Sequence, residues 1–302
     1  MRYLDPKADL TFKKVFGEHE DLVISLLNAL LPLRTGEEVV EVEYLPAEMV
    51  PDNPLRKNSI VDVRCKDAVG RQFIVEMQMV WSPEFLQRVL FNSAKAYLRQ
   101  LEKGFDYSLL KPVYSLNLVN DIFETDLPGF YHYYKLVHEE HTEKVIDGLH
   151  LVFVELPKFT PQSIREKKME VLWLRYLTEI KDGTDTVPPE LLENDETSKA
   201  VSVLETSSFS DAQLAAYDKF WDTISIEKTL YSSGERKGLM EGEALGLERG
   251  RKEGLAEGEA IGELKEKRRN ALGMKHAGIP IDTISKITGL SVKDVEELTF
   301  EN

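Results

Sequence analysis

Two apolar runs separated by a polar turn constrain the fold of this chain more than any other feature. Residues 60–79 read IVDVRCKDAVGRQFIVEMQM, an alternation that predicts a β-hairpin. Residues two apart in a strand share a face, so Glu76 and Gln78 point the same way as Ile74, and Asp62 projects from that face of the neighbouring strand. The opposite face is predicted to be apolar and to carry Val61, Val63, Val75, Met77 and Met79. The hairpin therefore brings two carboxylates and an amide together.

Asp62 and Glu76 come close enough to share an ion if the hairpin pairs near its middle. Alone they are unfavourable, because one of them would have to take up a proton. A divalent cation removes this conflict, and hard carboxylate oxygens suit Mg²⁺ or Mn²⁺, which also bind waters and phosphate oxygens. Gln78 could orient such a water or phosphate. Spacing alone leaves open a second interpretation, in which the three side chains line a solvated sheet face.

The surrounding sequence predicts an α/β unit over residues 1–157. A helical pattern precedes the hairpin, with Gly17 expected to divide it into two pieces. A long helix is predicted after the hairpin, with Pro83 near its start and Gly104 past its end. Four runs of β-branched and aromatic residues predict further strands of one mixed sheet: EEVVEVEYL, KPVYSLNLV, FYHYYKLVH and LHLVFVEL.

Three further regions are expected after residue 157. Residues 158–232 form a helical acidic extension with a start signal at Thr160-Pro161, in which PPELLENDETSKAVSVLETSSF opens another helical segment. Residues 233–265 form a glycine repeat, and residues 266–302 a small tail like a helix-turn-helix. The apolar contacts within this tail are expected to come from Ile284, Ile287, Leu290, Val295 and Leu298. Its second helix, SVKDVEEL, has one lysine against three acidic residues, a face that would repel phosphate.

Glycine recurs at every fourth position from residue 234 to residue 262, eight times in all. In a helix these glycines would cost roughly 6–8 kcal/mol relative to alanine, so an isolated helix would not survive. Two interpretations follow. The segment is a flexible charged linker, or its glycines let a second helix approach closely and join the chain into a homo-oligomer.

Charge and cysteine content restrict the classes of protein. The chain has 302 residues, a net charge of -15 and a single cysteine, Cys65. Disulfides within one chain and cysteine-based zinc sites are therefore excluded. The acidity argues against a protein that coats nucleic acid, but most of it lies in the middle of the chain, so neither end is strongly repelled from DNA and charge alone does not decide. No run is long and apolar enough to predict a membrane span or a signal peptide, and we expect a cytoplasmic protein with no membrane partner.

The residues flanking the hairpin resemble a known family. DLTFKKVFG, IVDVRC, FIVEMQM and QRVLFNSAKAYLRQLEKGFDY, leading to KPVYSLNLV, are similar in order and spacing to the PD-(D/E)XK nuclease superfamily. They are closest to its recombination-promoting nuclease (Rpn) branch, also described as transposases. The resemblance covers residues 3–157 and implies a restriction-endonuclease-like mixed sheet flanked by helices. It also implies a metal-dependent endonuclease, a hydrolase of DNA, with a role in recombination or mobile elements.

The resemblance assigns roles to residues of the hairpin. Asp62 takes the first metal-binding position and Glu76 the second, while the backbone carbonyl of Met77 is a further ligand of Mg²⁺ or Mn²⁺. Gln78 falls where the wider superfamily has lysine, which removes a cation that would help to stabilise the transition state. The family's N-terminal helix contributes an acidic residue near the metal, and Asp9 is the candidate.

A cation could come from the helix after the hairpin. Arg88 and Lys95 are seven residues apart, so they lie on roughly one face and could reach the site or the DNA backbone. A solvated or core-facing position is the alternative for each. Asp9 and Lys13 are four apart, and an intrahelical salt bridge is the alternative account of Asp9.

Two hypotheses for function follow. The first is a Mg²⁺-dependent DNA endonuclease that uses Asp62, Glu76 and Gln78. The second is a non-catalytic scaffold that keeps the nuclease fold and acts as an oligomerising, DNA-binding or regulatory protein. The glutamine at position 78 and the acidic balance favour the second hypothesis.

Overall fold

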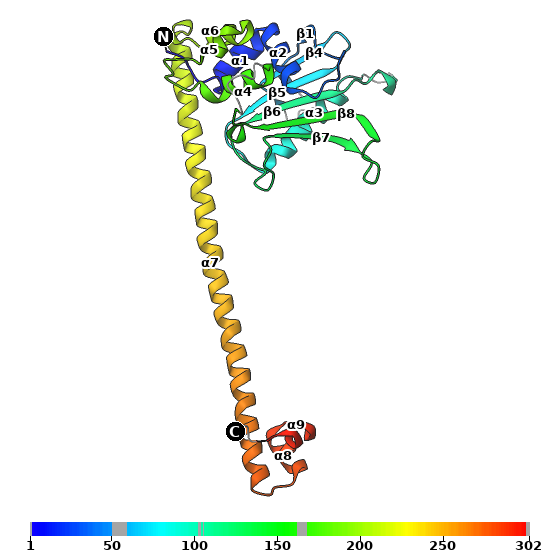
Figure 1. Ribbon diagram of the computed structural model, residues 1–302, viewed down its shortest axis with the longest axis vertical. Helices are drawn as coiled ribbons and strands as arrows, with labels where there is room; N and C mark the ends of the chain where they lie inside the picture. The colour runs from blue at the N-terminus through cyan, green and yellow to red at the C-terminus, as the bar shows by residue number, and fades with distance from the viewer. Residues whose placement is uncertain (1, 50–58, 102–103, 105, 162–167, 300–302) are drawn as a thin grey trace. The chain divides into compact units, whose positions relative to one another are not determined.

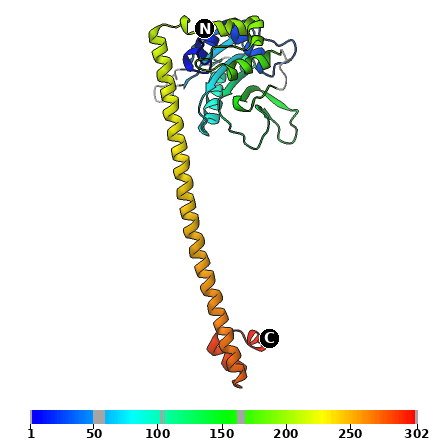
Figure 2. The ribbon, with the colours of Figure 1, turned by 60° about the vertical axis from the view of Figure 1, so that its left-hand side comes forward.

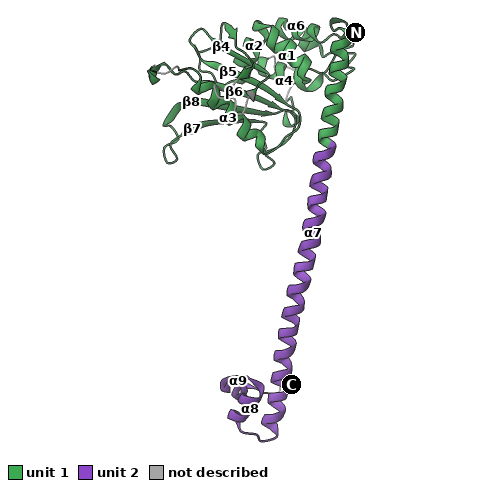
Figure 3. Ribbon diagram, turned by 180° about the vertical axis from the view of Figure 1, so that it is seen from behind, with its two compact units in different colours: residues 1–228 green, residues 229–302 purple. Residues whose placement is uncertain are grey.

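The protein is described by a computed structural model that covers residues 2–49, 59–101, 104, 106–161 and 168–299. The chain divides into two compact units, residues 1–228 and residues 229–302 (Figure 3). Helix α7, Asp211–His276, begins in the first unit and continues into the second.

A six-stranded mixed sheet forms the centre of the first unit (Figure 1), with strand order β1-β4-β5-β6-β8-β7. The strands are β1 Val42–Tyr44, β4 Val63–Asp67, β5 Gln72–Gln78, β6 Val113–Val119, β7 Tyr131–Val137 and β8 Val145–Glu155. β6 pairs parallel with both β5 and β8, and the other pairs are antiparallel. Every residue of β6 is buried, as expected for a strand covered on both faces. The predicted mixed α/β class is therefore confirmed.

A separate two-stranded ladder lies outside this sheet. It consists of β2 Glu48–Met49 and β3 Ser59–Ile60, which pair antiparallel. Its position matters because Met49 and the neighbouring Val61 pack with Ile74 and Ala96 in a small apolar cluster.

Helices cover both faces of the sheet. α1 Asp9–Glu18, α2 Glu20–Leu30 and α4 Met169–Glu179 pack on the face that contains the main apolar core. In Figure 2 the blue N-terminal helices lie beside the green helices that follow residue 168. α3, Glu84–Leu98, covers the other face, where Phe85 and Val89 pack against Val119 and Phe153.

The main core joins segments from before and after residue 157. Phe16 of α1 contacts the ring of Trp173 at a centroid distance of 5.4 Å, and Tyr176 lies 5.5 Å from Trp173. All three side chains are fully buried. Helices α5 Pro189–Glu193 and α6 Asp195–Val203 extend the same core through Leu191 and Val201.

The predicted hairpin forms, but its first strand is shorter than expected. The register pairs Val63 with Val75 and Cys65 with Phe73, and Gly70 adopts a φ of +88° in the turn. Val63, Val75 and Met77 join the main core as predicted. The placement of Val61 was wrong, because Val61 packs beside Ile74 under α3. The chain bends at Asp62 before β4 begins, which breaks the alternation of faces.

Helix boundaries differ from the prediction at two places. The division of the first helical segment falls at His19, which is extended, and α1 runs through Gly17. The segment after Pro188 forms two helices, because the Asn194 side chain accepts from the Thr197 N–H and starts a new helix there. Residues 162–167, where the predicted helix after Thr160-Pro161 begins, lie outside the described residues.

The second unit contains the rest of α7, α8 Ile281–Thr288 and α9 Val292–Glu297. Ala271, Ile284, Leu290 and Val295 form its apolar cluster, and Leu298 packs against it. The predicted helix pair is confirmed, with Gly289 at a φ of +72° in the turn and a capping box at Ser291. The predicted contact from Ile287 was wrong, because that side chain is 60% exposed.

Replacing Trp173 tests whether the helices after residue 157 complete the core. We expect Trp173→Ala to lower the free energy of unfolding by about 3–5 kcal/mol, because it empties the centre of the aromatic cluster. Urea unfolding followed by circular dichroism measures this change. Leu192→Ala is the control, because Leu192 is 48% exposed on α5. Equal unfolding curves for the two variants would contradict the shared core.

Candidate functional site

The bend before β4, the second half of β5, α1 and α3 meet at one group of polar side chains. The pairing of β4 with β5 ends at Val63 and Val75. Beyond that point the Met77 N–H donates to Asp62 Oδ2 at 2.7 Å. The carboxylate of Asp62 therefore takes the place of a strand partner and is fixed against β5.

The backbone of Met77 faces this same edge of β5. Successive residues of a strand direct their backbone groups to alternate edges. The Gln78 carbonyl accepts from the Asn120 N–H at 2.8 Å, on the side where β6 ends. The Met77 carbonyl is therefore directed to the opposite edge, where Asp62 lies.

Glu76 is buried beneath α3. Its side chain is 7% exposed, and Oε1 accepts from Asn92 Nδ2 at 3.1 Å. A guanidinium nitrogen of Arg88 lies 3.8 Å from the second oxygen, Oε2. Burial, together with the negative charge of Asp62, raises the pKa of Glu76 to about 7, although Asn92 and Arg88 act in the opposite direction.

Burial also disfavours the charged form of Asp62. Its side chain is 24% exposed. Burial raises its pKa above the ordinary value, although the Met77 N–H and the charge of Lys13 favour the ionised form. The charge of Asp62 is therefore held near that of Glu76, where the pairing of β4 with β5 ends.

Gln78 and Arg88 form one hydrogen-bonded unit. Gln78 Nε2 donates to the Val80 carbonyl, and its Oε1 accepts from Arg88. The Arg88 side chain is 48% exposed and also lies over the ring of Phe85, 4.7 Å from its centroid. Gln78 therefore anchors a cation that α3 contributes beside Glu76.

Asp9 and Lys13 of α1 lie next to Asp62. Lys13 Nζ is 2.6 Å from Asp9 Oδ1 and 3.9 Å from Asp62 Oδ1. Asp9 and Lys13 therefore form the intrahelical salt bridge that the sequence offered as the alternative account of Asp9, and Lys13 also lies near Asp62. Lys95 has a different environment, because its Nζ donates to the Met49 carbonyl and burial lowers its pKa.

Sequence reasoning missed Asn92. This residue is 3% exposed and lies one helical turn beyond Arg88, so the two side chains face Glu76 and Gln78 together. The available sequence signal for Asn92 was its position: a polar residue on the apolar face of a helix, four residues after the candidate cation Arg88. Ala96 lies a further four residues along α3, and its small side chain lets the helix lie close to Ile74.

The donor chemistry of this group fits a hard divalent cation. Asp62, Glu76 and the Met77 carbonyl offer only oxygen atoms. Across the described residues, no cluster of three or more histidine, cysteine, aspartate or glutamate side chains is placed to hold a metal ion. The two carboxylates would therefore share an ion with backbone oxygen and water, an arrangement that Mg²⁺ favours.

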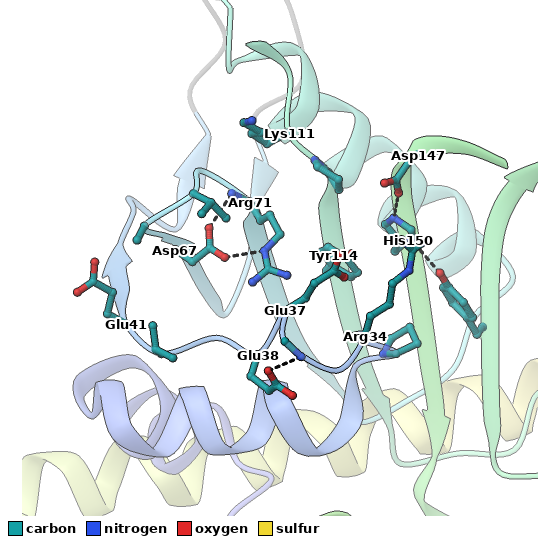
Figure 4. A pocket seen from close by; sticks show the side chains of 17 residues that line it. Arg34, Glu37, Glu38, Glu41, Asp67, Arg71, Lys111, Tyr114, Asp147 and His150 are labelled. Carbon is teal, nitrogen blue, oxygen red and sulfur yellow. Dashed lines mark hydrogen bonds and ion pairs between the residues drawn. The ribbon is translucent and has the colours of Figure 1, made fainter. Parts of the chain in front are cut away.

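A cavity of about 430 Å³ lies at the opposite end of β5 from Glu76 (Figure 4). Two of its carboxylates are engaged by neighbours, with Asp67 bound to Arg71 at 2.6 Å and Asp147 to His150 at 2.6 Å. Tyr114 stacks on His150 at a centroid distance of 4.3 Å. None of the residues that the sequence indicated as catalytic lines this cavity.

Comparison with known proteins gives one family. A family model described as PD-(D/E)XK nuclease family transposase matches residues 6–225. The match includes α1, the hairpin and α3, which carry all of the candidate residues. No curated protein and no solved structure gives a match.

The raised pKa of Glu76 predicts a stability that falls with pH in the metal-free chain. Between its ordinary value of 4.5 and about 7, the folded chain holds a proton that the unfolded chain has lost. Raising the pH through this window therefore favours unfolding, by up to about 3 kcal/mol. Glu76→Gln is neutral at every pH and should be spared this loss.

Urea unfolding in the presence of a chelator checks this prediction. We expect the chain and its Glu76→Gln variant to be similarly stable at pH 5, and the variant to be more stable at pH 8. A constant difference between the two across this range would show that Glu76 ionises normally.

Proposed function

The chain belongs to the PD-(D/E)XK nuclease family, and on that premise we propose that it is a metal-dependent DNA endonuclease that hydrolyses phosphodiester bonds. The observation that carries this proposal is the hydrogen bond that holds the Asp62 carboxylate on the Met77 N–H, next to Glu76, which is buried beneath α3. A role in recombination or mobile-element biology follows from the family. The expected metal is Mg²⁺ or Mn²⁺.

Asp62, Glu76 and the Met77 carbonyl would hold the ion. When bound, such an ion lowers the pKa of a coordinated water and offsets charge on the leaving oxygen. Asn92 orients Glu76, because it holds one carboxylate oxygen while the other stays directed at Arg88. Asp9 positions Lys13 near Asp62.

Cations from two helices replace the missing lysine at position 78 in this proposal. Arg88 presents its guanidinium beside Glu76, where it can contact a phosphate of the substrate. Lys13 lies beside Asp62. Gln78 acts through Arg88, because its side-chain oxygen accepts from that guanidinium. Lys95 adds positive charge further along α3.

A non-catalytic scaffold is the second candidate. The observation that favours it is the engagement of Gln78 with Val80 and Arg88, which removes this amide as a free ligand for water or phosphate. Such a protein would bind DNA or regulate a partner without cleaving. Metal-stimulated cleavage separates the two candidates.

No helix within the described residues has the length and apolar character needed to cross a membrane. A cytoplasmic location remains a prediction from the sequence.

Charge-neutral variants of the two carboxylates test the catalytic proposal. We expect Mg²⁺-dependent nicking of supercoiled plasmid by the chain, and a loss of about 100-fold or more in Asp62→Asn and Glu76→Gln, because each removes a charge that holds the metal. Asparagine keeps an oxygen that can accept from Met77. Asp222→Ala is the matched control, because Asp222 is an exposed acidic residue of α7.

Circular dichroism should give the same spectrum for the parent and all three variants. Equal nicking by the parent and both site variants would refute the catalytic proposal, and absence of cleavage in the parent would favour the scaffold.

We also propose that the chain forms a homo-oligomer through α7. Apart from the neighbouring turns of their own helix backbone, the eight glycines from Gly234 to Gly262 have no atom within 4 Å of the position that a Cβ would take, and the apolar side chains around them are exposed. These exposed side chains include Leu239, Met240, Leu245, Leu247, Leu255 and Ile261. A second copy of the helix would cover them.

Alanine at two of these glycines tests this association. We expect Gly242→Ala with Gly250→Ala to lower the mass measured by light scattering, because the added methyl groups keep a second helix at a distance. Within one helix the same changes should stabilise it by about 0.8–1.0 kcal/mol each. Glu243→Ala with Glu257→Ala is the control on the same helix. An unchanged mass in the glycine variant would exclude close packing on the glycine row.

A further inference from the structure

An apolar groove lies beside the candidate carboxylates, along the outer side of α3. It has a volume of about 760 Å³ and is lined by α3, by Ser82 just before this helix and by Ile60 of β3. Three large apolar side chains in its lining are exposed: Ile60 by 66%, Leu90 by 45% and Phe91 by 47%. Apolar side chains gathered in one groove indicate that something other than water covers them.

The groove is continuous with the candidate site. Arg88 and Asn92 line it, and these two residues also contact Gln78 and Glu76. A molecule in the groove would therefore lie within reach of the carboxylates that we propose to hold the metal.

Arg88 and the acidic Glu84 line this groove, and Lys95 lies beside the Phe91 ring at its edge. Arg88, Phe91 and Lys95 project within about 60° of one another around the helix. Lys95 Nζ lies 5.8 Å from the centroid of the Phe91 ring, and Arg88 lies over Phe85. In a chain with a net charge of -15, this side of α3 combines positive charge with an exposed aromatic face.

We propose that Phe91 is a stacking platform for an unpaired base of the DNA substrate. This inference rests on the proposed endonuclease function and specifies its substrate as DNA with single-stranded character. Unpaired bases offer π-faces that stack on aromatic side chains, and nearby cations contact the adjoining phosphates. A base within a duplex has both faces covered by its neighbours, so it would first have to be unstacked at a cost of a few kcal/mol. A groove with an apolar floor and a cationic side therefore favours unpaired DNA.

Binding without metal tests the platform separately from cleavage. Fluorescence anisotropy with a labelled 20-nucleotide oligothymidine and with a labelled 20-base-pair duplex, in chelator, gives both affinities. We expect tighter binding of the single strand. Phe91→Ala should weaken single-strand binding by roughly 5- to 100-fold, the range of one base–aromatic stack, and change duplex binding little. Phe91→Trp should retain single-strand affinity, because it restores a stacking face.

Tyr107→Ala is the matched control, because Tyr107 is 83% exposed but does not line the groove. Its affinities should equal those of the parent. Unchanged single-strand affinity in Phe91→Ala, or a parent that prefers the duplex, would overturn the inference. A lower oligomeric mass in Phe91→Ala with unchanged DNA binding would also overturn it, because a second copy would then occupy the groove.

The two proposals fail in different ways. A parent chain that binds single strands through Phe91 but never cleaves them refutes the endonuclease and supports the platform. A parent that nicks DNA through Asp62 and Glu76, with equal cleavage by Phe91→Ala on both kinds of substrate, supports the endonuclease and refutes the platform.

Discussion

The hydrogen bond from the Met77 N–H to the Asp62 carboxylate connects the fold to the site. At this point β4 has not yet begun, and β5 would otherwise expose a backbone donor at an unpaired edge. A carboxylate from the preceding bend satisfies that donor. The same contact fixes Asp62 beside Glu76, at the edge of β5 to which the Met77 carbonyl is directed. Without this contact, the Asp62 carboxylate would not be held in a fixed position relative to Glu76.

The second requirement is the cover that α3 provides. Ala96 is small enough for the helix to lie close to Ile74, and this approach buries Glu76. Burial would be costly for an ionised carboxylate, so the helix also contributes Asn92 and Arg88 as partners. The raised pKa of Glu76 shows that these partners offset only part of the cost. A divalent cation would offset the rest, which is why the metal-free site is a poor arrangement for stability alone.

Local patterns predicted the hairpin, α3 and the helix pair of the second unit, because period-two and period-3.6 alternation is encoded within short segments. The bend at Asp62 could not be predicted in this way. It depends on β3 pairing with β2, a contact between segments whose partnership the alternation does not encode. Asn92 was missed because its role arises only when α3 lies on β5. The break at Asn194 was missed because a capping residue inside a helical pattern has the same composition as a helix interior.

The central claim is that Asp62 and Glu76 together hold one divalent cation. Calorimetric titration of Mn²⁺ into the metal-free chain at pH 8, beside the Asp62→Asn/Glu76→Gln double variant, measures this most directly. We predict one binding event per chain for the parent and none for the double variant, with both proteins folded by circular dichroism. Equal binding of Mn²⁺ by the two proteins would contradict the account.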